Sequence, residues 1–246
     1  MNKETLVIAF NSQKGGAGKS TFTILTGSYL QYEKKLKVIV IDSDSPQYSI
    51  AGMRNREIGL MKSNAKLSEI ISLQGISEFE IVKSDTKEVA RLIEQYRERG
   101  IYDVILVDMP GTINMPGIVN AFAVMDYIFC PITPNEIYLN SSLVFLSFIQ
   151  DELVMNNFRL RGIYAFWNRI VANENKEIYN RYNQKLKRLN LRQLSTEIPA
   201  SVKFNKELIN PQKPVFISTF LASDKKMLLE SRVTALLNEI CNIMNV

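Results

Sequence analysis

The sequence predicts an α/β fold with a doubly wound, mostly parallel β-sheet in a single domain spanning residues 1–246. Apolar segments of strand length alternate along the chain with helical patterns. Most of these segments are continuously apolar, as expected of parallel strands that are covered on both faces. The chain has no linker, internal repeat or low-complexity tract, and its length suits one domain with a full core.

The expected strands are the apolar segments 5–11, 37–42, 102–108, 127–131, 161–167 and, with a weaker pattern, 191–195. The expected helices between them are 19–34, 86–99, 136–156 and 174–190. Gly100 follows the second of these, where glycine favours helix termination. From Ser223 onward, apolar residues recur at helical spacing, which predicts a helix packed on the sheet. The alternative is a helix on a membrane surface, but no basic residue follows Arg232.

Composition restricts the class of protein only loosely. A formal net charge of +5 is compatible with a nucleic acid, an acidic protein or an anionic membrane as partner. Cys130 and Cys241 lack metal-ligand spacing, and the chain has no histidine, so we expect both cysteines in the core. No apolar run has membrane-spanning length, and no signal peptide is recognisable. We therefore expect a cytoplasmic protein without a membrane partner.

A glycine-rich segment follows the first expected strand, with the sequence Lys14-Gly15-Gly16-Ala17-Gly18-Lys19-Ser20-Thr21. A strand, a glycine-rich turn and a helix N-terminus together form the context of a phosphate-binding loop, whose N–H groups converge on phosphate oxygens. In such a loop Lys19 reaches the β- and γ-phosphates, and the Ser20 hydroxyl binds Mg²⁺. The pattern predicts that residues 15–21 bind ATP together with Mg²⁺.

The loop departs from the strict motif, which has glycine at position 13, where this chain has Gln13. It has instead a second lysine, Lys14, before the glycines. The pattern Lys-Gly-Gly-x-Gly-Lys-Ser/Thr is the deviant Walker A motif, and through it the chain resembles the ParA/MinD family of P-loop ATPases. In that family the additional lysine reaches the nucleotide held by a second subunit. The resemblance therefore implies a catalytic role for Lys14 and Lys19 and an ATP-dependent sandwich homodimer.

Acidic residues end two further expected strands. The second strand runs into Asp42-Ser43-Asp44-Ser45-Pro46-Gln47, and the third ends at Asp108. Ligands of doubly wound sheets bind at such strand ends. By resemblance, Asp44 positions the attacking water, while Asp42 and Asp108 belong to the magnesium site. Ser45 is an additional residue relative to the Asp-x-Asp-Pro-Gln of ParA relatives.

Later segments extend the resemblance along the chain. Cys130-Pro131-Ile132-Thr133-Pro134, Trp167-Asn168-Arg169, Ile198-Pro199 and Lys213-Pro214-Val215 all have family counterparts in this order. The resemblance implies that Asn168 contacts the adenine and that the loop from Pro199 closes over it.

Basic residues occur in the expected helix 174–190 and after it. Arg181, Lys185, Arg188 and Arg192 line one helix face if the helix continues that far, and Lys203 and Lys206 come next. A solvated helix face would show the same pattern. ParA relatives bind DNA without sequence preference through basic residues in this region, so the resemblance implies DNA contacts for these six residues.

The predicted function is a slow, Mg-dependent ATPase that serves as a switch in plasmid or chromosome partitioning or in mobile-element maintenance, in association with the nucleoid. The chain resembles small Soj-type ParA proteins and the TraA-like homologues of Bacteroides conjugative elements. Its activating partner would be a ParB-like protein or a component of a transfer apparatus. The alternative is an ATP-gated scaffold that positions conjugative-transfer or other protein cargo without binding DNA. A biosynthetic amide-forming activity also stays open.

Overall fold

The continuous apolar segments form the inner strands of a parallel sheet. A computed structural model describes residues 4–13, 15–156, 158–171, 176–207 and 213–246. Within these residues the sheet has seven strands in the order β3-β2-β4-β1-β5-β6-β7, and all neighbouring pairs are parallel. The strands are β1 (Leu6–Phe10), β2 (Val38–Asp42), β3 (Glu80–Lys83), β4 (Val104–Asp108), β5 (Tyr127–Ile132), β6 (Gly162–Trp167) and β7 (Arg192–Gln193). The predicted doubly wound α/β fold is confirmed.

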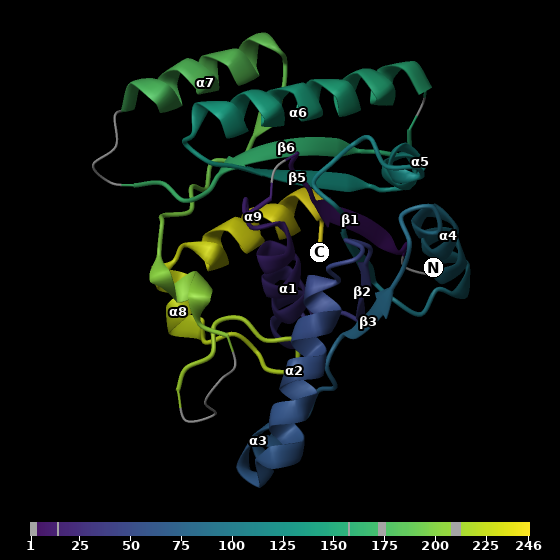
Figure 1. The fold of residues 1–246 in the computed structure, drawn as a ribbon, viewed down its shortest axis with the longest axis vertical. Coiled ribbons are helices and arrows are strands. Elements are labelled where there is room, and N and C mark those ends of the chain that lie inside the picture. The colour runs from purple at the N-terminus through teal and green to yellow at the C-terminus, as the bar shows by residue number, and fades with distance from the viewer. Residues whose placement is uncertain (1–3, 14, 157, 172–175, 208–212) are drawn as a thin grey trace.

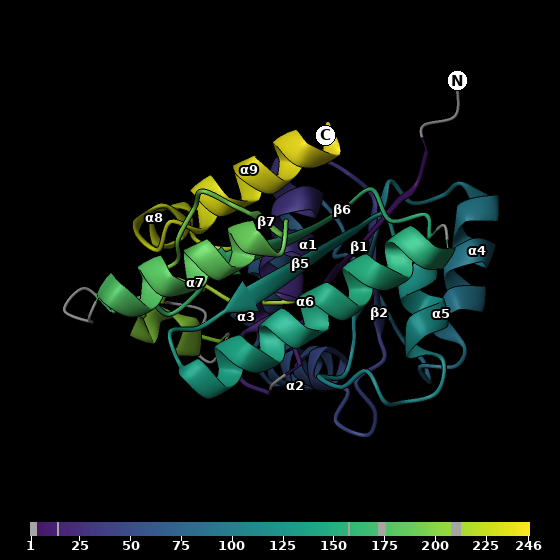
Figure 2. The same cartoon turned by 90° about the horizontal axis from the view of Figure 1, so that it is seen from above.

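Helices cover both faces of this sheet (Figure 1). They are α1 (Lys19–Ser28, continued by a π-helical turn at Tyr29–Glu33), α2 (Ser49–Ser63), α3 (Ala65–Leu73), α4 (Val89–Arg99), α5 (Ile118–Ala123), α6 (Glu136–Asn156), α7 (Lys176–Arg188), α8 (Lys225–Glu230) and α9 (Val233–Met244), with a 3₁₀ turn at Val202–Asn205. Viewed from the α7 side, α6 and α7 lie over strands β5 and β6 (Figure 2). No helix within the described parts of the chain is long and apolar enough to cross a membrane.

The two faces of the sheet carry separate cores because successive strand residues point to opposite sides. On one face Leu6, Ile8 and Phe10 of β1 pack in a cluster with residues of α1 and α9. On the other face Val7 and Ala9 pack in a cluster with residues of α4, α5, α6 and α7. Burial on both sides explains why the inner strands show no polar alternation.

The C-terminal segment packs on the sheet, as predicted. Leu236, Ile240 and Cys241 of α9 are buried in the core cluster around α1, and Cys130 is also buried. The segment forms two helices instead of one, since Arg232 between α8 and α9 has a left-handed backbone with φ of 62°.

The condition under which Arg192 would share the helix face is not met, and Arg192 lies within the weaker strand expected at 191–195. Helix α7 ends at Arg188, and Arg192 belongs to strand β7. Asn190, between them, has a positive φ of 53°, a conformation that an α-helix cannot contain. Arg192 therefore does not continue the basic face of α7.

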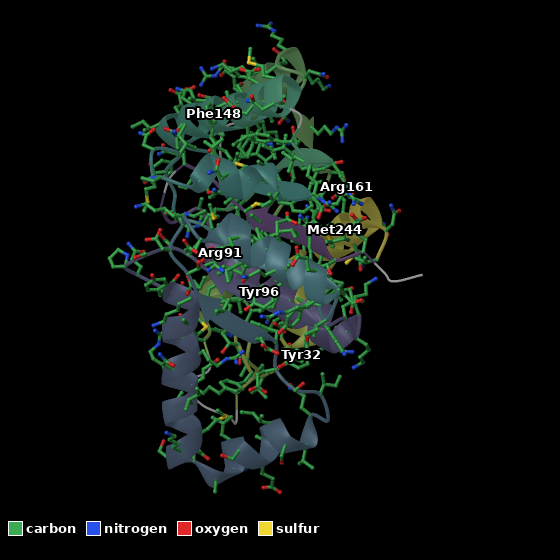
Figure 3. All side chains as sticks on the ribbon, turned by 90° about the vertical axis from the view of Figure 1, so that its right-hand side faces the viewer. Tyr32, Arg91, Tyr96, Phe148, Arg161 and Met244 are labelled. Atoms are coloured by element: carbon green, nitrogen blue, oxygen red, sulfur yellow. The ribbon has the colours of Figure 1, made fainter. Side chains whose placement is uncertain are left out.

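Helices α2 and α3 form an arm that extends away from the sheet (Figures 1 and 3). The arm is attached to the body by Arg54 and Glu57 of α2, which both bind Thr219. Arg54 donates to the Phe79 and Thr219 carbonyls, each at 2.8 Å. The buried Glu57 carboxylate accepts from the Thr219 N–H at 3.0 Å and from its hydroxyl. We call these three residues, Arg54, Glu57 and Thr219, the α2 clamp.

A buried carboxylate, that of Asp126, connects several segments at the amino edge of the sheet. Asp126, at the start of β5, accepts from the Val7 N–H at 2.8 Å. Arg97 of α4 lies 2.8 Å from the same carboxylate, and Arg159 and Arg161 each lie 3.2 Å from it; Arg161 is labelled in Figure 3. Four segments of the chain are thereby connected through one side chain.

Candidate functional site

The glycine loop connects β1 to α1 at the carboxyl edge of the sheet. Gly16 and Gly18 have positive φ values of 76° and 100°, which glycine adopts without strain. A Cβ at Gly18 would lie 3.1 Å from both the Asn168 amide nitrogen and the Phe22 ring. The sequence thus has glycine where the backbone turns and where it approaches a neighbouring strand. Lys14 lies outside the described residues.

Asn168 braces this loop from the end of β6. Its side-chain nitrogen donates to the Ala17 carbonyl at 2.8 Å, and its side-chain oxygen accepts from the Arg169 N–H at 2.9 Å. The next residue, Ile170, accepts from the Ala200 N–H at 2.8 Å and forms a bridge with Pro199. Asn168 and Pro199, the two residues predicted to contact adenine, therefore lie on adjoining backbone segments beside the loop.

The Ser20 hydroxyl, which is expected to bind Mg²⁺, contacts an aspartate at the end of a strand. The Ser20 hydroxyl donates to Asp108 Oδ2 at 2.6 Å. Asp42 and Asp108 are register partners on the neighbouring strands β2 and β4. The Ser49 hydroxyl, at the start of α2, donates to Ser20 Oγ at 3.2 Å. The structure thus brings together Ser20, Asp42 and Asp108, the three predicted magnesium residues.

Both carboxyl groups are buried, which disfavours their charged forms. Burial raises the pKa of Asp42, although its Oδ2 accepts from the Ala51 N–H at 2.9 Å. Burial also raises the pKa of Asp108 to about 7; the Ser20 hydrogen bond and Lys19 oppose this shift, and repulsion from Asp42 adds to it. A cation placed beside these carboxyls would stabilise their charged forms.

The donor set fits a hydrated Mg²⁺. Within the described residues, Oδ1 of Asp42 and Oδ1 of Asp108 are buried without a hydrogen-bond partner, a condition that usually marks an absent ion or water. The same part of the chain has no group of three or more acidic, cysteine or histidine side chains arranged for a metal. Mg²⁺ keeps several waters and takes phosphate oxygens as ligands, so Ser20 and the two aspartates suffice as the protein's share.

Two cavities flank the glycine loop. The first, here called the loop pocket, has a volume of about 210 Å³. It is lined by Gly15, Gly16, Gly18, Lys19, Ser20 and Thr21 on the loop and by Asp44, Gln47, Ser49 and Arg169 opposite. The second, the side pocket, measures about 280 Å³ and is lined by Gly15, Gly16, Ala17, Thr133, Pro134, Asn135, Tyr138 and Arg169. Asp44, predicted to orient water, therefore faces the predicted phosphate loop.

Ser49 and Arg169 are among the lining residues that were not predicted from the sequence. Ser49 reaches Ser20 because α2 begins directly after the acidic loop, and α2 itself was not expected. Arg169 was quoted only as the neighbour of Asn168, and nothing in its sequence context indicates that its side chain lies beside the glycines.

Four of the basic residues predicted to bind DNA belong to helix α7 and to the edge strand β7. Arg181 pairs with Glu136, Lys185 Nζ lies 4.4 Å from the Tyr182 ring centre, and Arg188 is exposed. These three belong to α7, which packs on the β-sheet face shared with α6. Arg192 is in the edge strand and donates to the Tyr164 hydroxyl at 3.0 Å.

Lys203 and Lys206 belong to the other face. Lys203 pairs with Glu230 of α8, and the adjacent Phe204 packs on the cluster that contains α1 and α9. Lys206 is exposed. The six basic residues therefore form two groups on opposite faces, with Arg192 at the edge between them.

Comparison with known proteins identifies a family of ATPases. The family model described as ATPase MipZ matches residues 6–193. An uncharacterised ATP-binding protein of Methanocaldococcus jannaschii is 27% identical over 142 residues, which is 51% of each chain. The chain thus spans about half the length of this curated relative.

Solved structures share the fold. The MinD cell division protein of Aquifex aeolicus superposes with a TM-score of 0.60 and 19% identity, covering 99% of this chain and 97% of MinD. A plasmid partition protein of Borrelia burgdorferi gives a TM-score of 0.55 at 21% identity, covering 81% of this chain and 91% of that protein. At such identities the likeness concerns the fold alone.

Proposed function

The chain belongs to the MipZ family of ATPases, within the ParA/MinD group, and we propose on this basis that it is a Mg-dependent, ATP-hydrolysing switch that dimerises around ATP. The observation that carries the proposal is that Lys19, Ser20 and Asp44 line one pocket, while Ser20 also donates to Asp108, the register partner of Asp42. The proposed biological role is partitioning of DNA or maintenance of a mobile element.

The described residues divide the chemistry among them. Lys19 and the loop N–H groups stabilise the negative charge of the phosphates. When bound beside Ser20 and Asp108, Mg²⁺ supplies further positive charge at the β- and γ-phosphates. Asp44, half-buried across the loop pocket, accepts a hydrogen bond from the attacking water and orients it. A dimer partner contributes Lys14, which completes the charge balance at the phosphates.

Substitution of Asp44 tests the switch. Asp44→Ala should retain ATP and accumulate as a dimer, because the water loses its orienting carboxylate while the phosphate contacts persist. Lys14→Ala should stay monomeric with ATP, since it lacks the residue that crosses the interface. Light scattering with ATP and with ADP measures both outcomes. A dimer that forms equally with ATP, with ADP and without nucleotide would contradict the proposal.

The six basic residues of α7, β7 and the segment containing Lys203 and Lys206 support DNA as the partner of the dimer. Lysine and arginine contacts to phosphates give binding without sequence preference. Two copies of the chain would present two sets of these basic residues, which favours binding by the dimer over the monomer. Slow hydrolysis until a partner protein completes the site would set how long DNA is held.

A further inference from the structure

Arg169 has an unusual backbone conformation next to the glycine loop. Its φ is 60°, in the left-handed region that side chains other than Gly, Asn and Asp seldom adopt. The conformation is held from both sides: the Arg169 N–H donates to Asn168 Oδ1 at 2.9 Å, and the following Ile170 N–H donates to the Ile198 carbonyl at 3.0 Å. Strained residues held by their surroundings concentrate at functional sites.

Arg169 lies where the two cavities meet. Gly15, Gly16 and Arg169 are the residues that line both the loop pocket and the side pocket. All three are exposed. Arg169 therefore borders the same opening as the backbone expected to bind phosphates.

Charge favours an anion at this opening. The charged residues lining the loop pocket are Lys19, Asp44 and Arg169, and the ion pairs found within the described residues do not include Arg169. A triphosphate carries more negative charge than Lys19 alone can balance. Guanidinium groups bind phosphate oxygens through two parallel hydrogen bonds, and are suited to this role by their planar geometry.

We propose that Arg169 binds the polyphosphate chain of ATP held by its own subunit, as a second cation beside Lys19. This inference rests on the ATP binding proposed above and adds a specificity-determining residue for phosphate number. The brace through Asn168 fixes the Arg169 backbone beside the loop, because the same amide that binds the Ala17 carbonyl also accepts from the Arg169 N–H.

The test uses variants that respect the backbone. Arg169→Asn removes the guanidinium but keeps a residue that tolerates positive φ, and Arg169→Lys keeps one charge without the planar fork. Arg91→Asn is the matched control, because Arg91 is an exposed arginine of α4 paired with Glu88 and lines neither cavity. Fluorescent, non-hydrolysable AMPPNP reports nucleotide binding in excess Mg²⁺, and inorganic tripolyphosphate displaces it.

Arg169→Asn should weaken both AMPPNP and tripolyphosphate about tenfold or more, the usual effect of losing charged hydrogen bonds. Arg169→Lys should recover part of the loss, and Arg91→Asn should bind as the wild type does. Weakened AMPPNP with unchanged tripolyphosphate would overturn the inference, because it would place Arg169 at the base or ribose. Unchanged affinity for both probes would also overturn it. A wild-type protein that binds neither probe would overturn the proposed ATP binding as well.

Discussion

At the scale of single residues, two buried aspartates have opposite surroundings. Asp126 is contacted by three arginines and a backbone N–H. Asp108 faces one hydroxyl and another carboxyl. The first carboxylate is therefore neutralised by the fold itself, whereas the second is left for a ligand. Stability should depend on Asp126 and nucleotide chemistry on Asp108.

Replacing Asp126 should destabilise the protein without altering its loop pocket. Asp126→Asn removes the fully buried partner of Arg97, whose side chain is only 10% exposed, and leaves Arg97 with Glu94 at 3.1 Å; breaking a buried pair in this way costs up to about 3–5 kcal/mol. Urea unfolding measures the change in the free energy of unfolding. Glu4→Gln is the control, since Glu4 pairs with Arg159 and Arg161 at the surface and such pairs contribute about 1 kcal/mol or less. Equal effects of the two substitutions would contradict the assignment.

At the scale of elements, the sequence predicted the strands that are buried on both faces and missed elements that are partly exposed. Strands β1, β2, β4, β5 and β6 were predicted because both faces are covered and the segments are continuously apolar. Strand β3 was missed, since Glu80–Lys83 is half-exposed and carries charges at both ends. Helix α2 was also missed, because the arm buries only a few of its residues and shows no clear apolar period.

The site follows the same division. The Ser20–Asp108 contact could be predicted, because a motif fixes both residues at strand and helix ends. The Asn168–Ala17 hydrogen bond and the position of Arg169 could not, since they depend on how β6 is placed against a loop more than a hundred residues earlier. The spacing of residues within a motif does not indicate contacts between segments that are distant in the sequence.

The α2 clamp predicts a pH effect on stability. Burial raises the pKa of Glu57 above its ordinary value of 4.5, although hydrogen bonds from Thr219 and Ser218 oppose the shift. From pH 4.5 upward to that raised pKa, the folded protein binds more protons than the unfolded chain at this residue. The contribution of Glu57 to stability therefore falls as pH rises through this interval.

Glu57→Gln removes this titration while retaining an acceptor for the Thr219 N–H. The free energy of unfolding of the wild type minus that of Glu57→Gln should be most favourable to the wild type near pH 4.5 and should decline as pH increases. Urea unfolding at a series of pH values measures the difference. A difference that is constant with pH would show that Glu57 keeps its ordinary pKa in the folded protein.

At the scale of the whole molecule, the glycine loop and the basic residues belong to different elements. The loop and the acidic strand ends lie at the carboxyl edge of the sheet, while the basic residues belong to α7, to the terminal strand β7 and to the segment that contains Lys203 and Lys206. Nucleotide and DNA could therefore be bound at the same time without competing for the same side chains. This separation is what a switch needs if ATP is to control DNA binding.

DNA binding should depend on nucleotide, salt and the basic groups on both faces. The ATP-bound Asp44→Ala dimer should bind DNA of any sequence, and its affinity should fall about 100-fold or more between about 50 and about 200 mM salt. Arg188→Ala and Lys206→Ala should each weaken binding, with a lower salt dependence. Fluorescence anisotropy with two unrelated duplexes measures these quantities, and Lys62→Ala on the arm is a control. An affinity that does not change with salt would exclude phosphate contacts as its source.

The brace between Asn168 and the glycine loop has a consequence for the newly made chain. Residues 15–21 leave the ribosome early, yet the strand partners of β1 are the later strands β4 and β5. The hydrogen-bond donor to the Ala17 carbonyl, Asn168, is synthesised 151 residues later. Because domains fold as units during synthesis, the phosphate-binding segment is made among the first and acquires its shape among the last. A chain interrupted before β6 would contain the whole motif and still lack a formed nucleotide site.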